Sequence, residues 1–322
     1  MASGSSLNRV ARDLEEQGLL HNGTVFKYYA DLMGFGQKIQ AGEYVLRRSM
    51  SMTEIIDILA AGDGGSEVMK FTVVEGLSVE SIAESLVKQG VFKTPERFLE
   101  LCRTGNGIKD QYDFIRTVAE QETEGRKYLL EGYLYPDTYE IYVGSSEEVV
   151  IGKMLDRMKV IYGAGYTRRA EELGMSMDEV LTLASLIEKE GKSDSFARIS
   201  SVFHNRLKKD MALGSDVTVQ YALNIKRLVL SQSELDTESP YNTYLHKGLP
   251  IGSICNPGDA AIEAALYPDQ EYLDEEYLYF TLTDPETGEI AFSKTLEEHE
   301  ATAERYRSLW AAYDARHSAG GN

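Results

Sequence analysis

The sequence predicts an α+β protein built from small modules at the front and one larger mixed domain behind them. The front third repeats a pair of amphipathic helices. Short alternating segments typical of antiparallel strands lie between helices, and hydrophobic residues make up 43% of the 322 positions, enough to bury a core. We expect three parts: a first repeat over 1–66, a second repeat over 67–127 and one domain over 128–322.

The repeat in the front third has an offset of 72 residues. Residues 9–20 and 81–92 both read as an amphipathic helix that ends at a glycine. A second helix follows in each copy, at 24–34 and 94–105. Small modules of this kind suit binding to a polymer, and nothing in them indicates catalysis. The alternative is a coincidence of two amphipathic helix pairs.

The segments around the two copies differ. An alternating segment at 67–76 predicts a strand before the second copy, whereas the first copy is preceded only by the small and polar residues 1–6. We therefore expect that an upstream segment, including any membrane anchor, is missing from this start. Between the copies, 42–47 reads as a strand and 51–65 as a helix with a serine cap and a glycine stop.

Beyond residue 127, the sequence predicts an extended aromatic-rich stretch, then helices, then two strands and a closing helix. An irregular region rich in Gly, Pro and Asn separates the middle helices from the rest. The extended stretch is 128–144, the helices are 147–163, 175–191, 194–211, 258–266 and the segment from Thr295 onward, and the strands lie near 275–283 and 289–294.

Composition excludes several classes of function. A net charge of −19 argues against nucleic acid, whose phosphates need a basic surface, and against a polybasic membrane-binding patch. The two cysteines and five histidines lack metal-ligand spacing, so we expect no metal and no cofactor. No apolar run reaches the ~18 residues that a membrane helix needs.

Two acidic residues close the helix predicted at 175–191. On a helical wheel, Glu188 and Glu190 each lie between apolar side chains, away from the polar face that carries Lys189. Loss of hydration there raises the pKa of a carboxyl, as a general acid requires near neutral pH. The two acids lie roughly 160° apart on the wheel, so they cannot act as a pair. The alternative is a frayed last turn with both acids in water.

Further stretches follow this helix in a fixed order. Together with LASLIEKEG, they closely resemble the YceG-like endolytic murein transglycosylases. The resemblance is dense from about 175 to 305 and looser in the front third. Single stretches such as YNTY carry little weight, but six in order over more than a hundred residues are specific. The five that follow LASLIEKEG are 200–223, 239–258, 260–268, 275–280 and 292–300.

The resemblance implies a bacterial cell-wall enzyme with LysM-like modules before a catalytic domain over 128–322. It would lie on the extracytoplasmic face of the membrane, held by one N-terminal anchor, and act on peptidoglycan glycan strands beside the cell-wall synthesis machinery. It would cut strands internally between N-acetylmuramic acid and N-acetylglucosamine and thereby limit strand length. One acid suffices, because the sugar's own C6 hydroxyl closes a 1,6-anhydro ring and neither water nor metal is required.

The family's catalytic glutamate is the second acid of its Glu-Lys-Glu stretch, which is Glu190 in this chain. Three positions depart from the family's pattern. Gly191 stands where threonine is frequent, Asp-Val-Thr at 216–218 replaces Asp-Pro-Thr, and Glu-His-Glu at 298–300 replaces Glu-His-Asn. These departures bear on the shape of the cleft and leave the acid in place.

We expect further residues to bind substrate. Alternating aromatic and amide side chains in 239–250 suit sugar faces and acetamido groups, or else form a tyrosine-rich turn that only packs. Asn205 either orients Glu190 or binds an acetamido group, or is a satisfied core amide. Asp194 reads as a helix cap, and His204 and His299 as structural. The expected substrate-binding residues are Glu188, Asn205, Asp216, Thr218, Tyr241, Asn242, Thr243 and Tyr244.

Two other functions stay open. A muramidase-type hydrolase of the same polymer would need a second acid to position water, and Asp216 is a candidate for it. Its stretch reads as extended and polar, which favours substrate binding or local hydrogen bonding over base chemistry. A peptidoglycan-binding division scaffold would use the front modules and need no acid at all. The ends of the products, anhydro or reducing, separate the transglycosylase from the hydrolase.

Overall fold

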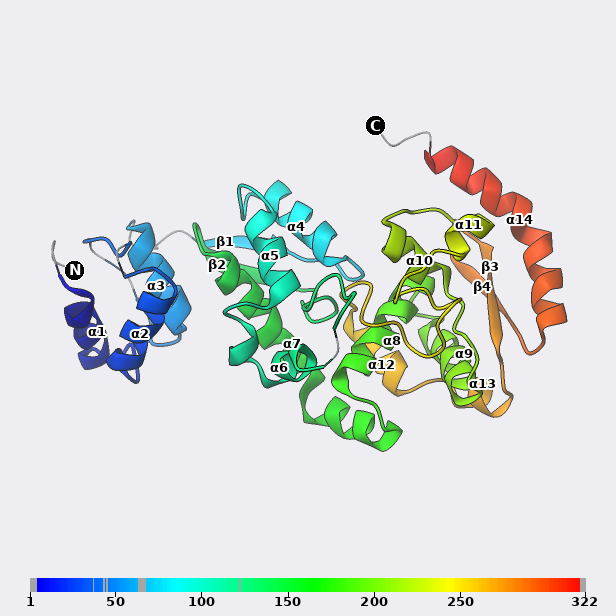
Figure 1. Ribbon diagram of the computed structural model, residues 1–322, viewed down its shortest axis with the longest axis horizontal. Helices are drawn as coiled ribbons and strands as arrows, with labels where there is room; N and C mark the ends of the chain where they lie inside the picture. The colour runs from blue at the N-terminus through cyan, green and yellow to red at the C-terminus, as the bar shows by residue number, and fades with distance from the viewer. Residues whose placement is uncertain are drawn as a thin grey trace.

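The computed structural model is an elongated molecule in which three groups of elements follow one another along the long axis (Figure 1). Mixed helices and two small antiparallel sheets make it an α+β protein, as predicted. No helix in the described part of the chain combines the length and apolarity needed to cross a membrane. The structure describes residues 5–36, 38–42, 44, 46–62, 68–121 and 123–318.

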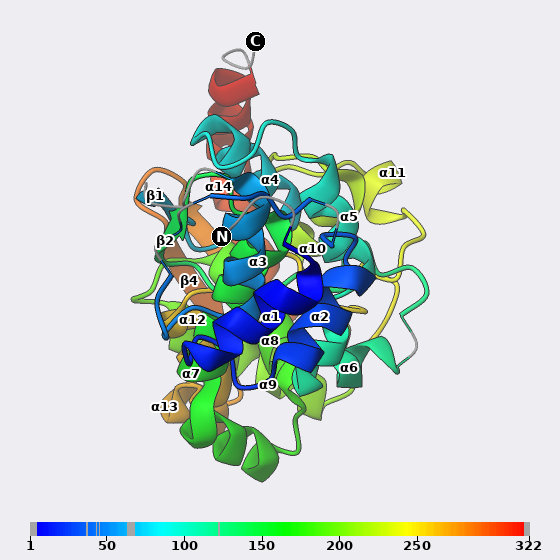
Figure 2. The same cartoon turned by 90° about the vertical axis from the view of Figure 1, so that its left-hand side faces the viewer.

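The first group consists of α1 (Leu7–Glu16), α2 (Gly23–Leu32) and α3 (Met52–Ala61) and faces the viewer in Figure 2. It has a hydrophobic core of its own. The strand expected at 42–47 is not found in its described residues, while residues 43 and 45 lie outside the description. Gly62 stops α3 in the left-handed conformation, earlier than the predicted end of 51–65, of which 63–65 are not described.

The two helix pairs that read as a repeat in the sequence are present in the structure. A shift of 72 residues places α1 on α4 (Val79–Lys88) and α2 within one residue of α5 (Glu96–Thr104). The glycine that follows each first helix, Gly18 or Gly90, adopts positive φ in both copies. Equivalent side chains are buried, among them Phe26 and Phe98, each 0% exposed. The helices predicted in both copies are therefore present, while the interpretation of the two pairs as a repeat stays a prediction.

In the second group, helices lie between two paired strands in the order of the chain. Strands β1 (Val68–Thr72) and β2 (Thr138–Tyr142) pair antiparallel. Of the stretch 128–144, which we expected to be extended, only β2 is a strand and much of the rest is a buried turn. The other elements of this group are α4, α5, the short 3₁₀ helix η1 (Lys109–Gln111), α6 (Asp113–Ala119) and α7 (Glu147–Leu173), which has a kink at Gly163.

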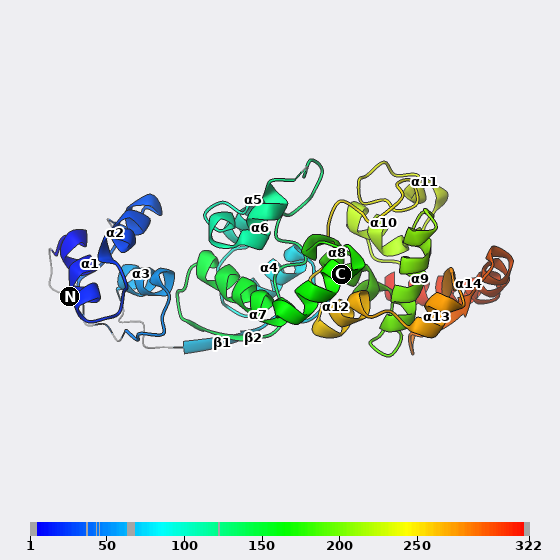
Figure 3. The same ribbon diagram turned by 90° about the horizontal axis from the view of Figure 1, so that it is seen from below.

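The third group surrounds one helix that is buried along most of its length, α8 (Met177–Glu190), which is central in Figure 3. Helix α10 was not predicted, because its sequence follows a glycine-containing irregular stretch and lacks helical periodicity. The other elements are α9 (Phe196–Lys208), α10 (Asp216–Leu223), α11 (Gln232–Leu235), α12 (Asp259–Leu266), α13 (Gln270–Asp274), β3 (Tyr279–Asp284), β4 (Glu289–Ser293) and α14 (Leu296–Ser318).

Helices α8 and α9 begin with different kinds of N-cap. Ser176 and Glu179 form the predicted capping box at the start of α8. Helix α9 begins at Phe196 with Ser195 as its N-cap, so the prediction that Asp194 caps this helix is wrong. Asp194 contributes only its backbone carbonyl, which accepts a bond from Arg198.

One continuous hydrophobic core extends through the second and third groups, from Phe71 to Leu266. The expected division at 127/128 therefore does not coincide with a break in packing, and the three-part organisation stays a prediction. The two cysteines, Cys102 and Cys255, are buried as free thiols in this region.

A buried carboxyl joins the second group to the third. Glu131, 0% exposed, accepts hydrogen bonds from the Val79 backbone at 2.9 Å, the Tyr221 hydroxyl at 2.9 Å and the Asn256 amide at 2.8 Å. Burial raises the pKa of Glu131 to about 8, while the bonds from Tyr221 and Val79 oppose the rise. Since Leu77 and Asn256 also form a β-bridge, the start of α4 is tied to the rest of the molecule.

We predict that Glu131→Gln lowers the free energy of unfolding by about 1–3 kcal/mol. With a pKa of about 8 the carboxyl is mostly protonated at pH 7, and its single O–H can be accepted by the Tyr221 hydroxyl, whereas the amide must turn an NH2 group toward partners that include the N–H donors of Val79 and Asn256. Urea denaturation at pH 7 measures the loss. The control is Glu84→Gln on the exposed side of α4, which should change the free energy by less than about 0.5 kcal/mol. Equal stability of the two variants would contradict this role for Glu131.

Candidate functional site

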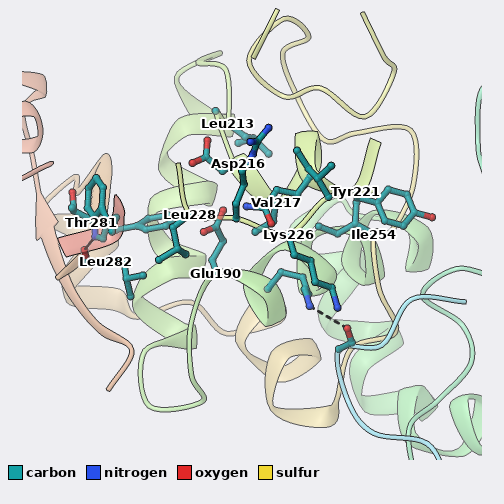
Figure 4. Close-up of a pocket in the computed structure, with 18 of the residues that line it drawn as sticks. Glu190, Leu213, Asp216, Val217, Tyr221, Lys226, Leu228, Ile254, Thr281 and Leu282 are labelled. Atoms are coloured by element: carbon teal, nitrogen blue, oxygen red, sulfur yellow. Dashed lines mark hydrogen bonds between the residues drawn. The ribbon is translucent and has the colours of Figure 1, made fainter. Parts of the chain in front are cut away.

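A cavity of about 800 Å³ opens where the second and third groups meet (Figure 4). Its walls come from the loop before α4 at 76–81, the end of α8, the start of α10 and the loop at 224–228. Strand β3 and helix α14 close the far side. Segments far apart in the sequence therefore meet around Glu190, which lies in the cavity wall.

Glu190 is the last residue of α8, and its carboxyl accepts a hydrogen bond from the Ser215 hydroxyl. Two buried threonines hold Ser215 in place. The Thr243 hydroxyl accepts from the Ser215 backbone at 3.0 Å, and the Thr218 hydroxyl donates to the Ser215 carbonyl at 2.7 Å. The two threonine hydroxyls lie 3.0 Å apart. Thr218 and Thr243 were both expected to bind substrate. In the structure they hydrogen-bond to Ser215, which in turn donates to Glu190.

Burial raises the pKa of Glu190 to about 7. The hydrogen bond from Ser215 favours the ionised form and opposes this rise. The nearby carboxyl of Asp216 adds to it, and the guanidinium of Arg206 opposes it. A carboxyl with this pKa still holds its proton at mildly acidic pH and can release it near neutrality, as general acid–base chemistry requires.

Asp216 brings a second carboxyl into the same cavity, as Figure 4 shows. It is the first residue of α10, so the expectation that it lies in an extended stretch is wrong. Burial raises its pKa, and a bond of 2.5 Å from the Tyr244 hydroxyl opposes the rise. Tyr244, 39% exposed, also lines the cavity.

Arg206 and His299 also line the cavity. The sequence did not single out Arg206, and it predicted a structural role for His299. Arg206 donates from Nε to the Leu278 carbonyl at 2.6 Å and from Nη1 to the Leu213 carbonyl at 2.6 Å. His299 bonds through Nδ1 to the Thr281 hydroxyl at 2.9 Å. No local pattern marks either residue, because distant parts of the chain supply their partners.

Glu188, the other acid near the end of α8, has its hydrogen-bond partner outside the cavity lining. The Glu188 carboxyl accepts from the Gly258 backbone at 3.1 Å, close to Gly76, and Glu188 is not among the residues that line the cavity. Burial and the neighbouring Glu75 carboxyl raise its pKa, against the bond from Gly258. The separation of Glu188 and Glu190 on the helical wheel thus persists in the structure.

Three of the expected substrate-binding residues are buried outside the cavity lining. The Asn205 amide donates to the backbone carbonyls of Tyr272 and Tyr277 at 3.1 and 3.0 Å. The Tyr241 hydroxyl accepts from the Lys127 backbone at 3.0 Å. The Asn242 amide donates to two carbonyls of the preceding loop at 2.8 Å each. Their polar groups have hydrogen-bond partners within the protein, and the structure does not bring them into the cavity, so their role in substrate binding stays a prediction.

Comparisons with known proteins agree with this architecture. A family model described as the YceG-like family matches residues 1–305. The endolytic murein transglycosylase of Bacillus subtilis is 34% identical over 309 residues, or 95% of this chain and 83% of that protein. The one of Streptococcus pneumoniae is 32% identical over 315 residues, and this chain spans 56% of its length. The crystal structure of the yceG-like protein of Listeria monocytogenes matches with a TM-score of 0.61 and 33% identity, covering 94% of this chain and 97% of that one.

We predict that Ser215→Ala and Asp216→Asn move the pKa of Glu190 in opposite directions. Loss of the Ser215 hydroxyl removes a donor to the carboxylate and raises the pKa further, whereas loss of the Asp216 charge lowers it. Titration of ¹³C-labelled glutamate carboxyls by NMR, with Glu190→Gln used to assign the signal, measures both. Shifts in the same direction would contradict the assignment of these two influences.

Proposed function

This chain belongs to the YceG-like family, and we propose that it is an endolytic lytic transglycosylase of peptidoglycan with Glu190 as its catalytic acid. The observation that carries the proposal is a buried carboxyl with a raised pKa in the wall of a large cavity. The relatives named endolytic murein transglycosylase support the reaction class. The substrate is the glycan strand, and the bond is the β-1,4 linkage from N-acetylmuramic acid to N-acetylglucosamine.

The reaction uses one carboxyl twice. Protonated Glu190 gives its proton to the bridging oxygen as the C1–O bond of the muramic acid breaks, and N-acetylglucosamine leaves as an alcohol. The carboxylate then takes the proton from the C6 hydroxyl of the same muramic acid, and that oxygen bonds to C1. The product carries a 1,6-anhydro ring, and Glu190 is protonated again. Ser215 steadies the carboxylate between the two steps.

We further propose that the front modules are LysM-like and place the strand. Helices α4 and α5 follow strand β1, as expected of such a module, and β1 pairs with β2, although η1 and α6 also lie between the two strands and β2 lies beyond the expected end of the module at residue 127. The loop at 76–81 extends from this module into the cavity wall. In the whole protein we propose one N-terminal anchor, action on the extracytoplasmic face of the membrane and contact with the cell-wall synthesis machinery.

A muramidase-type hydrolase is the second candidate, and a specific observation favours it. Asp216 lies in the same cavity as Glu190, close enough to raise its pKa. A second carboxyl is what a hydrolase needs to direct water at C1. In the transglycosylase, by contrast, Asp216 would tune Glu190 or bind sugar. Only the products decide between them.

We predict that wild type releases glycans with 1,6-anhydro ends from purified sacculi, while Glu190→Gln folds normally and loses activity about a hundredfold or more. Mass spectrometry of the released ends measures both. Glu188→Gln is the matched control and should lose much less. An amide variant at position 190 that keeps more than about a tenth of the activity would contradict the role of Glu190.

Digestion in H₂¹⁸O separates the two candidate reactions. A transglycosylase leaves anhydro ends without ¹⁸O, and Asp216→Asn changes the rate but not the product. A hydrolase leaves reducing ends that carry ¹⁸O, and Asp216→Asn abolishes them. Wild type that releases no glycan under any condition would leave the division scaffold as the better account.

A further inference from the structure

We infer that Lys189 and Lys226 form a binding site for a carboxylate carried by the muramic acid side chain of the substrate. The inference rests on the proposed function, since it assigns part of the same cavity to a second feature of the same polymer. Lys189 directly precedes Glu190, and Lys226 lies in the loop that follows α10. Both residues line the cavity.

Both lysine side chains contribute to the cavity wall. Lys189 Nζ lies 3.4 Å from the Gly76 carbonyl, at the loop that precedes α4. In Figure 4, the side chain of Lys226 extends toward that same hydrogen bond, which is drawn as a dashed line. An anion bound in the cavity would be attracted by the ammonium groups of both lysines.

The other cations of the cavity already have partners. Arg206 uses its guanidinium on backbone carbonyls and lies over the Tyr279 ring at 4.9 Å. Arg227 pairs with Glu234. Within the part of the chain that the structure describes, Lys189 and Lys226 have no carboxylate at ion-pair distance, and both are exposed to the cavity.

The acids of the cavity do not neutralise these lysines either. Asp216 accepts from Tyr244, and Asp314 on α14 accepts from the backbone of Leu228 and Val229 at 2.9 and 3.0 Å. Glu190 has its bond from Ser215. Glu188 lies outside the cavity lining; it attracts Lys189 electrostatically but forms no ion pair with it, and its own hydrogen bond comes from Gly258.

The negative charge of the whole protein favours a local cationic site where an anionic polymer binds. With a net charge of −19, the protein repels an anionic polymer, and peptidoglycan strands carry carboxylates. Each muramic acid has a lactyl group that is either a free carboxylate or the attachment point of a peptide with free carboxylates. The reaction cuts beside the muramic acid, so this group lies near Glu190 and within reach of the neighbouring lysines.

The test measures binding of defined glycan strands to the inactive Glu190→Gln protein, with and without Lys189→Gln plus Lys226→Gln. Three strands are compared: one that bears peptides, one stripped by an amidase so that the lactyl carboxylates are free, and the stripped strand converted to methylamides. The control variant is Lys88→Gln plus Lys208→Gln. Both lysines are exposed and lie outside the cavity lining, and replacing them removes the same amount of charge.

We expect Lys189→Gln plus Lys226→Gln to raise Kd about tenfold for strands that bear carboxylates and to leave Kd for the methylamide strand unchanged. The rise in Kd should disappear at high salt. An effect confined to the peptide-bearing strand assigns the site to peptide carboxylates, and one on the stripped strand assigns it to the lactyl group. An equal rise on the methylamide strand, or an equal effect of the control pair, overturns the inference. Because binding is measured in an inactive protein, these outcomes do not depend on the proposed reaction, whose failure would appear only in the product analysis.

Discussion

The site depends on a half-buried carboxyl at the end of a buried helix, in the wall of the cavity. Helix α8 is apolar on almost every side up to Ile187, so the chain cannot turn Glu190 into bulk solvent without exposing the helix. A lone buried carboxyl is unfavourable when charged, and the surrounding groups decide how strongly. Ser215 offers one donor, and Asp216 offers a like charge. The packing around Glu190 therefore raises its pKa.

The same constraint explains why the cavity needs parts from the whole chain. Ser215 and Asp216 stand at the start of α10, which Tyr221 and Lys127 tie to the turn at 126–134. Glu131 in that turn also holds the start of α4, whose preceding loop forms one wall. The second group of elements thus shares a core with the helix that carries Glu190.

The sequence predicted what depends on local pattern. The helix around Glu190, its capping box, the paired helices of the repeat and the two strands before the last helix follow from periodicity and caps. It did not predict α10, because the helix follows an irregular stretch that contains Gly214 and its own sequence lacks helical periodicity. Nor could it separate Tyr244, which faces the cavity, from Tyr241 and Asn242, which are buried in the same stretch, since alternation alone does not tell which side is inward. Arg206 and His299 reach the cavity through partners distant in sequence, which no local signal reveals.

The most direct test of this account is kcat/KM against pH on a defined glycan strand, with folding checked at each point. The pKa of Glu190 is raised to about 7, and the reaction begins with the protonated form. The account therefore predicts that kcat/KM falls as pH rises through about 7, since the free enzyme then loses the proton it must donate. A profile that is flat from pH ~4 to ~8, or one that falls near the ~4.3 of a solvated glutamate, would contradict it.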